Sequence, residues 1–91
     1  MTRRHYKDRV AHLGCILCAH LGTPGTPAEL HHIREGQGMS QRASDFLIIP
    51  LCQYHHTGPG GVHGLGMRAF ERTYNLTELD LLAMVIEGVS K

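Results

Sequence analysis

Three cysteines and one histidine fall into two short motifs with the same internal spacing. Cys15 and Cys18 are separated by two residues, and so are Cys52 and His55. This gap lets both side chains of a motif reach one ion from a tight turn, and four nitrogen and sulfur ligands suit a tetrahedral zinc site. The spacing therefore predicts a structural Zn²⁺ that holds these two parts of the chain together.

The cysteine count and the N-terminus bear on the compartment. Three cysteines cannot all pair in disulfides, so thiolates on a metal in a reducing cytosol are favoured. A lone Cys-x-x-Cys is also typical of thioredoxin-like redox sites, but the sequence lacks the βαβ pattern that accompanies them. No apolar run approaches the roughly 18–20 residues of a membrane span, and "MTRRHYKDRVAH" is not a secretory signal. We expect a cytoplasmic protein without a membrane partner.

Length and charge limit what the chain can do alone. Its 91 residues include few aromatic side chains and no tryptophan. Such a chain forms one small domain with a thin core, for which a metal ion is a common reinforcement. The formal net charge is only +1, and a near-neutral domain holds phosphates weakly because that affinity grows with every phosphate neutralised. We expect a single domain over residues 1–91.

The first half of the chain predicts one helix and two strands. The helix is expected over residues 2–13, ended by Gly14, and the Cys-x-x-Cys stretch is expected to be a tight turn. The strand candidates are residues 29–33, "ELHHI", and residues 46–51, "FLIIPL", of which the second is the stronger.

The second half predicts helices. After Cys52 we expect a helical turn, a break at "TGPGG", and one helix over residues 63–74. Met67, Phe70 and Tyr74 would share its buried face. These elements together predict a small α+β fold.

The final helix, over residues 77–89, has the clearest signals. Thr77 and Asp80 form a variant of the capping box. Its apolar stripe, interpreted as core or as a dimer seam, consists of Leu79, Leu82, Ile86 and Val89.

Histidine is the outlier of the composition, with eight residues. Five of them lie in the stretches "AELHHIREGQG" and "IPLCQYHHTGPGGVHGLG". Adjacent side chains point to opposite faces of a strand, and on a helical turn they diverge by about 100°. The two histidines of each pair can therefore serve different sites. His55 would bind zinc, and His56 would face a second metal site.

The chain resembles the zinc-stapled HNH endonucleases, and in particular the phage recombination-enhancement nucleases called Ref. The likeness rests on "HHIREGQGMSQRASDFLIIPLCQYHH", with Cys-x-x-Cys before it and "GVHGLG" and "FERTY" after it, and its core covers residues 30–74. It implies a ββα-metal core stapled by zinc, with flanking helices. It also implies metal-dependent hydrolysis of DNA by a phage or prophage protein acting in recombination in the bacterial cytoplasm, with the RecA filament as a partner.

The resemblance also implies residue roles. His31, His56 and His63 would bind the catalytic divalent ion, which is Mg²⁺, Mn²⁺, Ni²⁺ or Zn²⁺. His32 would be the general base that activates water. The chemistry is consistent with these roles, because imidazole titrates near neutral pH and a cation stabilises the charge that develops on the phosphate.

The sequence departs from the family at two points. HNH enzymes usually carry an Asn just before the "LC" motif that supports the base, whereas Leu47 stands here and Asp45 is the nearest polar residue. Asp45 is a candidate to orient His32 or a ligand. Arg42 is a candidate phosphate clamp, with a plain surface arginine as the alternative. The long basic N-terminal extension of the Ref nucleases is missing here apart from the short "TRRHYKDR". We therefore expect weak unaided DNA binding.

An alternative explains the clustered histidines without catalysis. One crowded structural zinc site plus surface histidines would make the chain a zinc-finger-like module that binds DNA or protein. A DNA reader should present a basic recognition helix, but Arg68 and Arg72 beside Glu71 are sparse for that role. The number of metal ions per chain separates the two hypotheses, and the sequence does not predict an oligomeric state.

Overall fold

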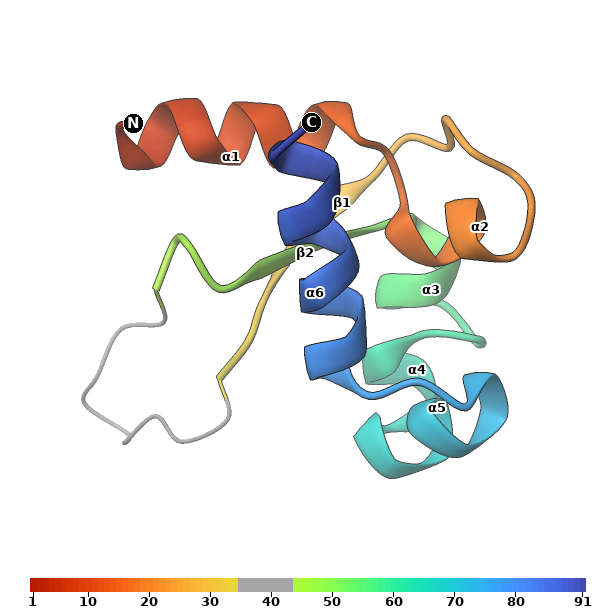
Figure 1. The fold of residues 1–91 in the computed structure, drawn as a ribbon. Coiled ribbons are helices and arrows are strands. Elements are labelled where there is room, and N and C mark those ends of the chain that lie inside the picture. Colours follow the sequence, from red (N-terminus) through yellow and green to blue (C-terminus); the bar gives the residue numbers. More distant parts are fainter. Residues whose placement is uncertain (35–43) are drawn as a thin grey trace.

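The structure is a computed structural model that describes residues 1–34 and 44–91 (Figure 1). In these residues the chain forms a small α+β fold with a two-stranded antiparallel sheet, which confirms the predicted fold class at that level. The elements in chain order are α1 (Arg3–His12), α2 (Ile16–His20), β1 (Glu29–His32), β2 (Ile48–Leu51), α3 (Gln53–His56), α4 (Val62–Leu65), α5 (Met67–Tyr74) and α6 (Glu78–Val89).

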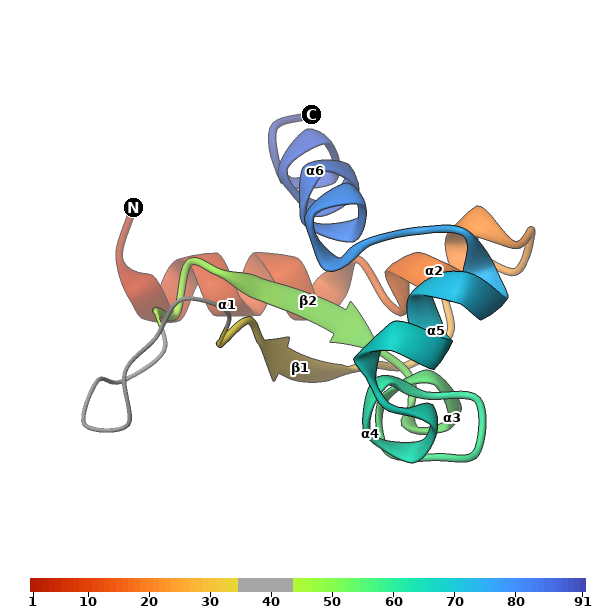
Figure 2. The ribbon, with the colours of Figure 1, turned by 90° about the horizontal axis from the view of Figure 1, so that it is seen from below.

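The sheet sits at the centre of the described fold. Its register pairs His31 with Ile49 and His32 with Ile48. Helices α1, α2 and α6 all pack against β2. In Figure 1 α6 crosses the sheet and α1 runs along its upper side, while α2, α3, α4 and α5 gather at one end; Figure 2 shows the same grouping from below. The largest fully buried residues from these elements include Val10, Leu17, Ile48, Ile49, Leu51, Phe70, Leu81 and Val85.

The first helix begins and ends close to where the sequence predicts. Thr2 caps α1, because its side chain accepts a hydrogen bond from the His5 backbone N–H at 3.1 Å. Gly14 follows the helix at φ +75°, where a Cβ would approach the Thr26 carbonyl oxygen to 2.9 Å. Only glycine suits both constraints, so the chain turns here into the cysteine segment. That segment is the short helix α2 rather than the tight turn expected.

Two other boundaries differ from the prediction. The helix expected over residues 63–74 is two helices, α4 and α5, because Gly66 between them has φ +85° and ψ 152°, which breaks the helical hydrogen bonding. The strand expected to begin at Phe46 begins at Ile48 instead. Phe46 packs against Tyr6 of α1, with ring centroids 5.2 Å apart.

The last helix shows one correct and one wrong prediction. Thr77 and Asp80 form the capping box, with bonds of 3.0 Å and 2.8 Å between their side chains and backbones. The predicted stripe is wrong at Leu79 and Ile86, which are 63% and 51% exposed. The buried face of α6 instead consists of Glu78, Leu81, Leu82, Val85 and Val89. A carboxylate therefore occupies the first buried position, and an apolar pattern cannot reveal it.

Candidate metal centres

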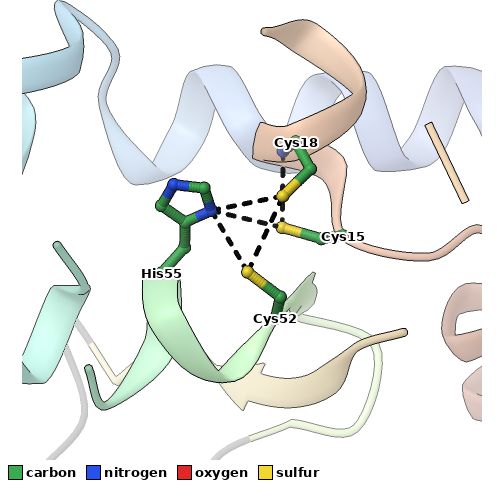
Figure 3. Close-up of side chains that lie close together, drawn as sticks. All are labelled: Cys15, Cys18, Cys52 and His55. Carbon is green, nitrogen blue, oxygen red and sulfur yellow. Dashed lines mark hydrogen bonds between the residues drawn. The ribbon is translucent and has the colours of Figure 1, made fainter. Parts of the chain in front are cut away.

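The two short motifs of the sequence meet in space. Cys15 caps α2, and its sulfur accepts a hydrogen bond from the Cys18 backbone N–H at 3.4 Å. Cys52 is the residue before α3, and His55 lies within that helix. Figure 3 shows the three sulfur atoms and Nδ1 of His55 facing one another across the gap between α2 and α3. The structure thus brings together all four residues that the spacing singles out.

The distances within this cluster fit a tetrahedral ion. The sulfurs of Cys18 and Cys52 are 3.7 Å apart. Nδ1 of His55 lies 3.3 Å from the Cys52 sulfur, and 3.5 Å and 3.7 Å from those of Cys18 and Cys15. A zinc tetrahedron with Zn–S bonds of about 2.3 Å and a Zn–N bond of about 2.0–2.1 Å has edges of about 3.8 Å between sulfurs and about 3.6 Å between sulfur and nitrogen. The cluster can therefore hold a zinc ion.

Burial and hydrogen bonds set the pKa of the donor groups in this cluster. Burial raises the pKa of the Cys15 thiol to about 11, so without a positive neighbour this group stays protonated. Burial also works to raise the pKa of Cys52, but hydrogen bonds from the His55 backbone N–H and from the Cys18 thiol outweigh it, and the pKa is lowered. Burial lowers the pKa of His55, which keeps its imidazole neutral and able to donate a lone pair.

A second cluster consists of three imidazoles. His31 comes from β1, His56 from α3 and His63 from α4. Their ring centroids are 4.9–5.4 Å apart, and one nitrogen from each lies within 4.8 Å of the others. His55 and His56 diverge from α3 into different clusters, as the sequence predicts. Three neutral imidazoles are a donor set that suits divalent transition metals.

Glycines hold α4 close to α3. A Cβ on Gly61 would lie 2.7 Å from the backbone carbonyl carbons of His55 and His56, and a Cβ on Gly64 would collide with the Gly58 carbonyl. These glycines let the turn that carries His63 pack directly against the helix that carries His56. They thus let the His56 and His63 side chains come together.

Each of three histidines in this region has a carboxylate partner. Nε2 of His31 lies 2.6 Å from the Glu78 carboxylate, and Nδ1 of His56 lies 2.9 Å from that of Glu29. Nε2 of His32 lies 3.0 Å from Asp45, the partner that the sequence suggests. The partnerships of Glu78 and Glu29 were not predicted. Glu78 reads as an ordinary acidic residue in the first turn of a helix, and Glu29 as a solvated charge at a strand end.

Burial and hydrogen bonding set the charge of these groups. Burial lowers the pKa of His31, and the hydrogen bond to Glu78 opposes this without reversing it. The hydrogen bond from His32 holds the pKa of Asp45 below its ordinary value. Asp45 is therefore a carboxylate at neutral pH and a hydrogen-bond acceptor for Nε2–H of His32.

The imidazole cluster lies in an open pocket of about 710 Å³. Its lining includes His31, His56 and His63, together with His32, Arg34 and Glu78. His32 thus faces the same space as the cluster although it is not part of it. Arg42, the phosphate clamp suggested by the sequence, lies outside the described residues. Arg34, two residues after His32, is an exposed arginine in the pocket lining.

Comparison with known proteins adds no family to these observations. No protein-family model matches the chain, and no curated protein matches it. None of the helices in residues 1–34 and 44–91 has the length and apolar character needed to cross a membrane.

Proposed function

We propose that this chain is a metal-dependent endonuclease of the HNH class that hydrolyses phosphodiester bonds in DNA. The observation that carries the proposal is the pocket in which His31, His56 and His63 converge beside His32. A zinc-finger-like module needs the sulfur-rich cluster but has no use for a second, open cluster of imidazoles. An enzyme that cleaves phosphodiesters needs both a cation at the phosphate and a base for water.

The order of the elements supports the class. Two antiparallel strands are followed directly by α3, which is the order of a ββα-metal core. The proposal assigns structural Zn²⁺ to the cluster of three cysteines and His55, where it joins α2 to the start of α3. A second divalent ion would be held by the three imidazoles, and it would stabilise the negative charge that develops on the phosphate and on the leaving oxygen.

His32 is the proposed general base. Asp45 accepts its Nε2–H at 3.0 Å, so Nδ1 is the atom that takes a proton from water. The water oxygen then forms a bond to phosphorus while the bond from phosphorus to the leaving sugar oxygen breaks, and that oxygen receives a proton from solvent. Asp45 takes the place of the Asn that supports the base in most HNH enzymes. Arg34, which is exposed in the pocket lining, would contact a phosphate oxygen.

The biological setting follows from the resemblance to the Ref nucleases. It suggests a phage or prophage protein that acts in recombination in a bacterial cytoplasm, with cleavage directed by a RecA filament. The formal charge of +1 supports such help, because a near-neutral domain holds DNA weakly by itself.

Cleavage of supercoiled plasmid tests the proposal. The zinc-loaded protein would be incubated with Mn²⁺, Mg²⁺ or Ni²⁺, with and without a RecA filament on the DNA. We expect nicked or linear product from the unmodified protein and from His12→Ala, whose histidine is exposed on α1. His32→Ala should give none above background. No cleavage under any of these conditions would contradict the proposal and favour a zinc-stapled binding module.

A further inference from the structure

Glu78 occupies an unusual place for a carboxylate. It is the first residue of α6, and its side chain is only 10% exposed. Its partner His31 is 8% exposed by the same measure, and 2.6 Å separates Nε2 of His31 from Oε2 of Glu78. Buried carboxylates are uncommon unless they are paired, so this contact explains why a charge is tolerated on the buried face of α6.

The distance indicates what kind of contact this is. Two ligands of the same ion, with bonds of about 2.1 Å, are about 3.0 Å apart at right angles and further apart in a tetrahedron. A separation of 2.6 Å is shorter than either and lies just below the usual range of about 2.7–2.9 Å for a charge-assisted N–H···O hydrogen bond. Glu78 is therefore a hydrogen-bond partner of His31 and not a second ligand of the same ion.

A carboxylate accepts hydrogen bonds and does not donate them, so the proton of this bond belongs to Nε2 of His31. The neutral ring then has its lone pair on Nδ1, which is the nitrogen left for an ion in the cluster. The same reasoning applies to His56, whose Nδ1–H donates to Glu29 at 2.9 Å and leaves Nε2 free.

We infer that Glu78 is a positioning residue for the second ion, which fixes the tautomer and the orientation of His31 and so links α6 to the imidazole cluster. The inference rests on the proposed function, because it takes the imidazole cluster to be an ion site. Carboxylates behind metal-binding histidines raise the basicity of the ring and hold its angle, and their removal typically weakens metal binding about 10–100-fold.

Glu29 provides an internal comparison. Its side chain is 53% exposed, against 10% for Glu78. Water already reaches the exposed carboxylate of Glu29 and can take its place, whereas the His31 ring and the Glu78 carboxylate are both largely buried and water replaces that partner less well. The loss of Glu78 should therefore weaken the site more than the loss of Glu29.

Calorimetric titration of Mn²⁺ into the zinc-loaded protein, without DNA, tests the inference. We expect Glu78→Ala to weaken binding about 10–100-fold, and Glu78→Gln to recover part of the loss because its amide oxygen still accepts the His31 N–H. Glu29→Ala should weaken binding less than Glu78→Ala, and Glu87→Gln, an exposed change on the same helix, should leave it unchanged. Thermal melts without Mn²⁺ control for folding.

A second measurement does not depend on the variants. Nitrogen NMR of the imidazole rings in the unmodified, zinc-loaded protein should show His31 as the Nε2–H tautomer. An Nδ1–H tautomer would overturn the inference, as would equal Mn²⁺ affinity in a folded Glu78→Ala. Both results would leave the nuclease proposal intact. If the unmodified protein bound no second ion, the ion site itself would be wrong, and both proposals would fall together.

Discussion

The two clusters share the helix α3 but differ in nearly every physical respect. The sulfur-rich cluster is largely buried, and its donor atoms are spaced like the corners of a zinc tetrahedron. The imidazole cluster opens into a pocket of about 710 Å³, and His63 is exposed. A closed set of four ligands suits an ion that holds the fold together, whereas an open set of three leaves room for water or substrate.

Their neighbours differ in the same sense. The donor atoms of the first cluster contact mainly one another and backbone N–H groups, so its surroundings have little to adjust. The second cluster is surrounded by carboxylates from β1 and α6, which orient individual rings. The buried cluster is therefore best characterised by the distances between its own donor atoms. The open cluster is best characterised by the carboxylates that contact its imidazole rings.

Loss of the first cluster should have the largest effect. Cys18→Ser removes a thiolate, and apparent zinc-binding free energies of roughly 10–16 kcal/mol exceed the whole stability of most small domains. We expect the variant to be unfolded by circular dichroism and to carry no zinc by elemental analysis, while His20→Ala, an exposed change on α2, stays folded. A folded, zinc-free Cys18→Ser protein would show that the first cluster is not needed for folding. The two clusters would then not differ in structural role.

Loss of the proposed base should remove the reaction but not either ion. We expect His32→Ala to lower the cleavage rate about 10²–10⁴-fold, the usual contribution of a general base. Zinc content, the melting temperature and Mn²⁺ affinity should stay close to those of the unmodified protein, because His32 belongs to neither cluster. Near-normal cleavage would transfer the role to another histidine of the pocket, with His63 the first candidate.

Loss of one imidazole ligand should separate the clusters directly. We expect His56→Ala to abolish measurable Mn²⁺ or Ni²⁺ binding in the absence of DNA while the zinc content stays at one ion per chain. Mg²⁺ should bind weakly even to the unmodified protein, because it prefers oxygen ligands and retains water. Calorimetry decides between the outcomes. Second-ion binding that survives His56→Ala would mean that His55 and His56 do not serve different metals.

Spacing predicted the first cluster, because each of its two motifs offers two donor atoms from one tight segment and four such donors suit a single tetrahedral zinc. The divergence of His55 and His56 was predictable because adjacent side chains on a helical turn diverge by about 100°. Glu78 was not predictable, because its contact with His31 joins residues far apart in the sequence and depends on how α6 crosses the sheet. The stripe on α6 was misread at Leu79 and Ile86, because the buried face begins with Glu78, a polar residue that an apolar pattern leaves out.

The fold was predictable where local signals were strong. The first helix, the capping box at Thr77 and the strands all appear at or near their expected positions. The break between α4 and α5 was missed because Gly66, whose φ is +85°, lies within an otherwise helical pattern. Glycine adopts helical and left-handed backbone angles with similar ease, so a single sequence does not show which one it takes.

The smallest expected effect concerns Asp45 and would sharpen the contrast between a ligand and a supporting residue. Asp45 is partly exposed and contacts both His32, at 3.0 Å, and Lys7, at 4.0 Å. Its function in the proposal is to accept the Nε2–H of His32, and an amide oxygen accepts that bond as well. Asp45→Asn should therefore retain most of the cleavage activity, and it would restore the residue type that supports the base in most HNH enzymes. Asp45→Ala should lose more, about tenfold, since a misoriented base is still present and water can replace the missing partner.

Neither change should alter zinc content or Mn²⁺ affinity. Cleavage rates and Mn²⁺ titrations of the two variants provide the test: equal rates for Asn and Ala would show that His32 needs no support from this position, and a loss of Mn²⁺ binding would show that Asp45 acts on the ion site instead.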